Sequence, residues 1–264
     1  MWKRTLLIVL AVLLPVAFVV APPLVAGGRF TGERELAGAF GSAFTGYWRS
    51  GGGTFTPELR ELIDYWMRYH LVKAVTAGIL LVVLTVLGVR LWGAFARAGR
   101  LGPARRAALA AGGTFVTVFA LFSLGLVMAN VQGMIAPFAS LLPLLTDGSP
   151  GGPEAAALEQ VRQGLAAGSA SPALTVLIED FARYHVAMAV IAAVVAAGLA
   201  AGGVLLWRRF AATPRPDRRT RRVLASSGVL ASLLPLLVAV IAVANTTTAA
   251  DPAPALLALL QGGW

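Results

Sequence analysis

The sequence predicts an all-α integral membrane protein with five transmembrane helices, and three observations support this prediction. Hydrophobic residues make up 58% of the 264 residues and charged residues only 13%, whereas soluble domains carry about 25% charged residues. Five apolar stretches each provide the ~20 helical residues that cross a membrane. The basic residues also gather on one side of the predicted topology. Because lipid admits only helices or closed barrels, uninterrupted stretches of this length indicate helices.

The first span covers residues 5–25 and follows the basic residues Lys3 and Arg4. The small residues at 26–28 could form a cleavage site, so this region also resembles a secretory signal peptide. The apolar stretch is longer than in a usual signal peptide, so we predict a retained signal-anchor in residues 1–28. Cleavage is the alternative, and it would leave four spans in unchanged orientation.

The rest of the chain is predicted to be an internal repeat. A shift of 115 positions (185 − 70) places Arg68-Tyr69-His70 on Arg183-Tyr184-His185, and about a third of positions 54–145 are identical to their counterparts in 169–260. The two modules are residues 29–147, with spans at 71–91 and 109–129, and residues 148–264, with spans at 186–207 and 223–244. Two spans per copy give both copies the same orientation, related by an axis along the membrane normal.

Each module is predicted to begin with short amphipathic outer helices. One lies near residues 32–44 in the first module and 153–166 in the second. Another follows Thr56-Pro57 or Ser171-Pro172, where an N-cap residue precedes proline at the first helical position. Its apolar residues recur three and four apart, which suits a helix lying at the membrane interface before the span begins. Linkers rich in Gly, Ser or Pro are expected at 50–53, 148–152 and 168–171.

The net charge of +10 follows this topology. Residues 1–4, 90–106 and 208–222 hold 14 of the 22 Lys and Arg residues and one acidic residue. By the positive-inside rule, the N-terminus and both basic turns are cytoplasmic and the C-terminus is outside. We therefore expect a multi-pass protein of the cell (plasma) membrane, bacterial by its composition, with membrane lipids as partners. The basic turns are short and lack interleaved aromatic residues, so no nucleic-acid partner is predicted.

The repeated triplets form the main candidate site, together with an asparagine that ends the outward-going span of each module. Topology places all of these residues at the outer side, as a paired polar cluster for an anionic headgroup, a lipid-linked sugar or a small polar ligand. The triplets could instead anchor the helices at the interface, and the asparagines could form inter-helix hydrogen bonds or helix caps. The predicted set is Arg68, Tyr69, His70, Asn130, Arg183, Tyr184, His185 and Asn245.

The triplet arginines are expected to form ion pairs along their helices. Asp64 lies four residues before Arg68, and Glu179 lies four residues before Arg183. Oppositely charged residues at this spacing face each other on a helix surface. The sequence therefore predicts one such pair in each module.

A redox or metal protein is the alternative functional class. His70 and His185 are the two histidines of the chain and could both bind one haem iron, or form a copper site. The favoured prediction remains a non-enzymatic membrane-interaction or scaffold protein with no catalytic residues, metal or cofactor, because no hydrolase or phosphate-loop motif is present.

Two further features bear on partners. The interiors of the spans lack ionisable residues, which argues against an ion-coupled carrier and leaves a transporter subunit as a second alternative. Gly198 and Gly202 form a small-residue face that suits close helix packing. That contact could lie within the chain, with a membrane protein partner or in a homo-oligomer. The chain has no cysteine, so disulfides and thiol chemistry are excluded.

Overall fold

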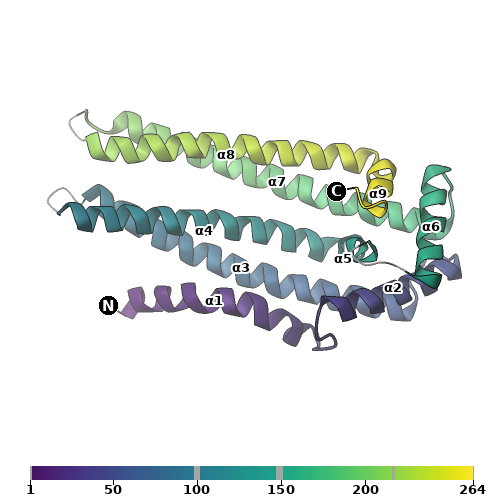
Figure 1. Ribbon diagram of the computed structural model, residues 1–264. Helices are drawn as coiled ribbons and strands as arrows, with labels where there is room; N and C mark the ends of the chain where they lie inside the picture. Colours follow the sequence, from purple (N-terminus) through teal and green to yellow (C-terminus); the bar gives the residue numbers. More distant parts are fainter. Residues whose placement is uncertain (1, 98–101, 147–150, 216–217, 264) are drawn as a thin grey trace. The chain divides into compact units, whose positions relative to one another are not determined.

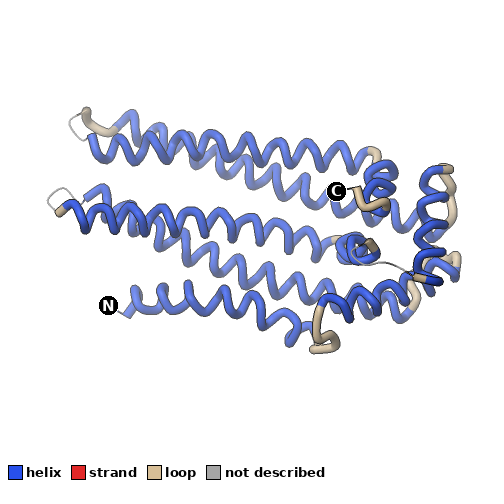
Figure 2. Tube along the Cα trace, viewed as in Figure 1, coloured by secondary structure: helices blue, strands red, loops and turns tan. Residues whose placement is uncertain are grey.

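The computed structural model describes residues 2–97, 102–146, 151–215 and 218–263, and every regular element within them is helical. Figure 1 labels the helices in chain order, and Figure 2 shows that mostly short loops connect them. The predicted linker at 148–152 and both predicted basic turns lie partly outside the described residues.

Five helices are long and apolar enough to cross a membrane, as the sequence predicts. They are α1 (Trp2–Ala26), α3 (Pro57–Arg97), α4 (Pro103–Ile135), α7 (Pro172–Ala212) and α8 (Arg218–Ala250). Helices α3 and α7 begin 115 residues apart (172 − 57), and so do α4 and α8 (218 − 103). The 41 residues of α3 or of α7 make about 60 Å of helix at ~1.5 Å per residue. That length is about twice a ~30 Å hydrocarbon layer.

Shorter elements complete the chain. They are α2 (Glu33–Ser50), α5 (Pro137–Leu141), the 3-10 helix η1 (Leu142–Leu145), α6 (Gly152–Ala166) and α9 (Pro252–Leu260). Helices α2 and α6 lie where the sequence predicts short helices, although α2 continues past the expected end at residue 44. It stops at Gly51, whose φ of 64° lies in the left-handed region, which glycine adopts without steric cost.

The chain divides into two compact units, each assembled from three stretches of sequence. The first unit comprises segments of the five long helices, in Met1–Val19, Lys73–Met128 and Val190–Ala242. The second unit comprises Val20–Val72, Ala129–Ala189 and Val243–Trp264. It therefore contains all the short helices, the first turns of α3 and α7, and the last turns of α4 and α8.

The second unit has an aromatic and aliphatic core. Helix α2 packs against α6 and η1, and α6 packs against α9 (Figure 1). Tyr47 of α2 and Phe138 of α5 are almost completely buried in this core. The Tyr47 hydroxyl donates to the Ala173 carbonyl at 3.3 Å, and burial raises the pKa of Tyr47 to about 12. This packing positions the site described below.

The amphipathic stretch that follows each predicted N-cap is not a separate short helix. It forms the first turns of α3 and α7, which continue without a break into the apolar part of each helix. Thr56 and Ser171 act as the predicted N-caps, accepting from the N–H groups of Leu59 and Leu174 at 3.4 Å. Both leucines are buried in the core of the second unit. The apolar stripe of this stretch is therefore removed from water by packing within the second unit.

Candidate functional site

Each predicted histidine contacts the asparagine of its own predicted module. His70 Nδ1 lies 3.0 Å from Asn130 Oδ1, between α3 and α4, and His185 Nδ1 lies 2.8 Å from Asn245 Oδ1, between α7 and α8. An amide oxygen only accepts hydrogen bonds, so Nδ1 of each ring donates and Nε2 is the acceptor atom. The structure thus brings four predicted site residues together as two His–Asn pairs, each an inter-helix hydrogen bond.

A second polar contact joins the same helices 22 residues further along α3 (92 − 70) and α7 (207 − 185). Trp92 Nε1 donates to Thr117 Oγ1 at 3.1 Å, and Trp207 Nε1 donates to Ser232 Oγ at 3.0 Å. A Cβ at Gly113 would lie 2.9 Å from the Trp92 ring, so the indole sits directly on the facing helix. The sequence analysis missed these Trp–hydroxyl pairs, although the shift of 115 positions also places Trp92 on Trp207. The spacing of 25 residues to a hydroxyl side chain in both modules was the signal that could have found them.

The triplet arginines do not join the histidines. Arg183 is 60% exposed, and its Nη1 lies 2.7 Å from Asp180 Oδ1, so the predicted pairing with Glu179 is wrong. Asp180 is held in place because its other carboxylate oxygen accepts the Ala139 N–H at 2.9 Å. Among the described residues, no ion pair links Arg68 to the carboxylate four positions before it. Within the described residues, neither arginine therefore has a hydrogen bond or ion pair with the histidines or asparagines of the predicted site.

The first triplet packs against aromatic rings and helix α4. Tyr69 stacks on Trp66 with centroids 4.9 Å apart, and His70 meets the same indole edge-on at 4.7 Å. A Cβ at Gly133 would lie 2.8 Å from His70 Nε2, so this nitrogen faces α4 at close range. With Nδ1 bonded to Asn130, neither nitrogen has room for a metal ion unless α4 moves. The haem or copper alternative therefore does not fit the geometry around His70.

A pocket of about 460 Å³ lies beside the second triplet, within the second unit. Its volume falls in the ~300–1,000 Å³ range of small-ligand sites. Of the eight predicted site residues, only Tyr184 and His185 line it. Sequence reasoning missed the other lining residues, which come from α5, η1, α7 and the ends of η1 and α9: Ala139, Ser140, Pro143, Thr146, Phe181, Leu259 and Gly262.

Two hydroxyl groups on one wall of the pocket are partly engaged. Ser140 Oγ accepts from Trp66 Nε1 at 2.8 Å and donates to the Pro137 carbonyl at 2.9 Å. Thr146 Oγ1 donates to the Pro143 carbonyl at 2.9 Å. Because each hydroxyl has one hydrogen and two lone pairs, both oxygens retain a lone pair that can accept a further hydrogen bond.

Two polar groups on α7 remain unused within the part of the chain that the structure describes. The Tyr184 hydroxyl makes no hydrogen bond there. His185 is only 7% exposed, and its Nε2 is buried without a hydrogen-bond partner among the described residues. A buried acceptor left unpaired costs about 1–3 kcal/mol. The second triplet therefore offers the Tyr184 phenol to a group that occupies the pocket, whereas His185 Nε2 is closed to solvent.

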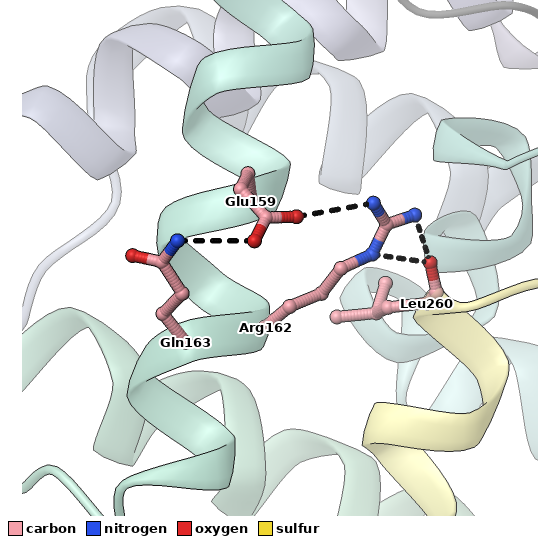
Figure 3. Close-up of polar contacts among 4 residues, drawn as sticks. All are labelled: Glu159, Arg162, Gln163 and Leu260. Carbon is pink, nitrogen blue, oxygen red and sulfur yellow. Dashed lines mark hydrogen bonds and ion pairs between the residues drawn. The ribbon is translucent and has the colours of Figure 1, made fainter.

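Arg162 of α6 fixes the α9 wall of the pocket (Figure 3). Its guanidinium donates to the Leu260 carbonyl through Nε at 2.8 Å and through Nη2. This carbonyl ends α9, where no later helical N–H reaches it, and it adjoins the lining residue Leu259. Glu159 lies 3.6 Å from Arg162 Nη1 and accepts a hydrogen bond from Gln163 at 3.0 Å.

The predicted glycine face is not a contact within the described chain. A Cβ at Gly198 or Gly202 would meet nothing within 4 Å there. The adjacent Gly203 makes the close approach instead, since its Cβ would lie 2.9 Å from the Ala231 carbonyl oxygen. Intramolecular packing therefore uses the neighbouring side of α7, and a partner at Gly198 and Gly202 stays a prediction.

Comparison of the chain with protein-family models, with curated proteins and with solved structures gives no match. The functional argument consequently depends on the pocket and on the two kinds of polar pair. Both are observed directly in the structure of this chain.

Proposed function

We propose that this chain is a polytopic integral membrane protein that binds the polar end of a lipid, without catalysis, in the pocket beside Tyr184 and His185. The proposal rests on the position of the pocket along α7, next to the exposed apolar part of that helix. Large apolar side chains of α7 are exposed from Val186 to Trp207, and Val186 directly follows the lining residue His185. A headgroup in the pocket would thus adjoin an apolar surface suited to acyl chains.

Exposed apolar bands on all five long helices support membrane insertion. Large apolar side chains are exposed within residues 6–25 of α1, 71–89 of α3, 115–135 of α4, 186–207 of α7 and 229–243 of α8. Soluble monomers rarely expose apolar surface on this scale. On α1, α3, α4 and α7 the bands run for about 20 residues, or about 30 Å along a helix, which matches the hydrocarbon layer. The α8 band is shorter, at 15 residues (243 − 229 + 1).

The spacing of the polar pairs along the helices is close to the thickness of the hydrocarbon layer. In each module the His–Asn and Trp–hydroxyl pairs lie 22 residues apart, or about 33 Å at ~1.5 Å per residue. We propose that one pair lies at each face of the hydrocarbon layer, where tryptophan and other part-polar side chains are favoured. Hydrogen bonds at both ends would hold each pair of long helices together.

The proposal includes two tandem repeat modules and a fixed orientation. The 115-residue interval between helix starts and the matching polar pairs in each half support the duplication. The excess of Lys and Arg in residues 1–4, 90–106 and 208–222 supports a cytoplasmic location for these stretches. The second unit, with its pocket, then faces the outside of the plasma membrane.

Lipid retention by the purified protein tests this proposal. Protein extracted with a mild detergent is expected to carry about one lipid per chain in native mass spectrometry. Thr146→Trp places a large side chain at the pocket and is expected to abolish retention. Thr175→Trp is the matched control, because Thr175 is exposed on α7 and, like Thr146, donates one side-chain hydrogen bond to a backbone carbonyl. Equal retention by the two variants, or none by the unmodified chain, would refute the proposal.

A further inference from the structure

We infer that the pocket accepts an uncharged group rich in hydroxyls, such as the sugar or glycerol end of a neutral lipid. This inference rests on the proposed function and names the chemistry of the headgroup. Of the ligands that the sequence suggested, it favours a lipid-linked sugar over an anionic headgroup. Three features of the described lining lead to it: the absence of charged side chains, the hydrogen-bonding groups and the apolar side chains.

The described lining of the pocket offers no counter-ion. None of its nine lining residues carries a charged side chain. Arg183 is bound to Asp180 at 2.7 Å, and Arg162 is bound to the Leu260 carbonyl. A phosphate or carboxylate would lose its hydration in the pocket without gaining a compensating charge. An uncharged ligand avoids that cost.

The polar groups of the pocket require hydrogen-bond donors. His185 offers no donor to the pocket, because Nδ1 holds the ring proton in its bond to Asn245 and Nε2 is buried. Ser140 and Thr146 have already committed their hydroxyl protons to backbone carbonyls, so they can only accept further bonds. Among the described lining side chains, Tyr184 alone can donate. A phosphate dianion supplies only acceptors, whereas several neighbouring hydroxyls supply both donors and acceptors.

The remaining lining suits the carbon skeleton of such a group. Phe181, Leu259 and Pro143 give the pocket an apolar portion that can contact the C–H groups of a sugar ring or of glycerol. The volume of about 460 Å³ corresponds to the bulk volume of about 15 water molecules at ~30 Å³ each. That is room for one sugar-sized group, with the apolar band of α7 beginning at the adjacent Val186.

The same hydroxyl chemistry could come from a membrane glycolipid or from a free sugar, and one experiment distinguishes them. Full-length protein in phosphatidylcholine nanodiscs is titrated with monoglucosyl diacylglycerol, with phosphatidic acid and with free methyl glucoside, and binding is read by native mass spectrometry. We expect saturable binding of the glucolipid to the unmodified chain. We also expect methyl glucoside to compete with the glucolipid for the pocket. Methyl glucoside binding as tightly as the glucolipid would support the inferred chemistry and assign the site to a free sugar.

Two conservative variants locate the binding. Tyr184→Phe is expected to weaken glucolipid binding about fivefold, as for loss of one net hydrogen bond, while Tyr69→Phe removes the matching hydroxyl outside the pocket and leaves binding unchanged. Equal effects of the two variants would overturn the inference. Preferential, Thr146→Trp-sensitive binding of phosphatidic acid would overturn the headgroup chemistry but leave the lipid-binding function standing. Absence of any lipid or sugar binding would overturn both.

Discussion

The substitution Gly133→Ala gives the sharpest test of how His70 is held. A Cβ at residue 133 would lie 2.8 Å from His70 Nε2 and from its Cε1 atom. The ring cannot move away freely, because Nδ1 is bonded to Asn130 at 3.0 Å and the ring meets Trp66 edge-on at 4.7 Å. Overpacking of this kind costs about 1–3 kcal/mol, and displacing the ring would also lose a hydrogen bond of about 1 kcal/mol.

Gly125→Ala is the matched control on the same helix. Nothing in the described chain lies within 4 Å of its Cβ position, so this change gains only the ~0.5–1 kcal/mol by which alanine exceeds glycine inside a helix. Gly133→Ala receives the same gain, which leaves it about 2 kcal/mol less stable than the unmodified chain. The two variants then differ by about 3 kcal/mol, or roughly 6–12 °C in Tm for a chain of this size.

Thermal unfolding in detergent, followed by circular dichroism, measures both variants under one set of conditions. Similar Tm values for Gly133→Ala and Gly125→Ala would refute the close packing of His70 on α4. They would also reopen the possibility that His70 binds a metal ion. A loss confined to Gly133→Ala would support the geometry described for the first triplet.

Three further predictions follow from single contacts. Trp207→Phe removes the indole donor and is expected to cost about 1 kcal/mol, and its effect should add to that of Trp92→Phe because the two pairs share no partner. Arg162→Met is expected to lower the free energy of unfolding by about 1.5–3 kcal/mol, because it frees the end of α9. Glu159→Gln is expected to lower it by at most about 1 kcal/mol, because that ion pair is exposed. Thermal unfolding measures both variants. Because burial raises the pKa of Tyr47 from 10.0 to about 12, the unfolded chain loses this proton first, and stability is expected to fall as pH rises from 10 to 12. Tyr47→Phe should remove that part of the pH dependence of Tm, and an unchanged profile would contradict the burial of this hydroxyl.

The long helices could be predicted from the sequence because their signal is local. An apolar stretch can be recognised from its own length and composition. The 115-residue interval let each helix of one half be checked against its counterpart in the other half. The placement of Asn130 and Asn245 near the histidines followed from topology alone. Both hydrogen bonds connect residues 60 positions apart, as two consecutive antiparallel helices allow.

The pocket could not be predicted, because its walls come from three separated parts of the chain. Residues 139–146, 181–185 and 259–262 meet only after α5, α7 and α9 have packed. The ion-pair partner of Arg183 could not be predicted either. On a helix, side chains three and four residues earlier are both close enough to pair with it. The choice of Asp180 follows from a tertiary contact with the Ala139 N–H, which no local pattern reveals.

The chain's lack of cysteine allows one measurement to test the central claim, a membrane-spanning protein whose pocket faces outward. Single-cysteine variants at Thr146, Val194 and Thr213 are treated with a membrane-impermeant maleimide, before and after the cells are permeabilised. Labelling of Thr146→Cys in intact cells, of Thr213→Cys only after permeabilisation, and of Val194→Cys in neither condition is the expected result. Labelling of Val194→Cys, or of Thr213→Cys but not Thr146→Cys in intact cells, would contradict the account.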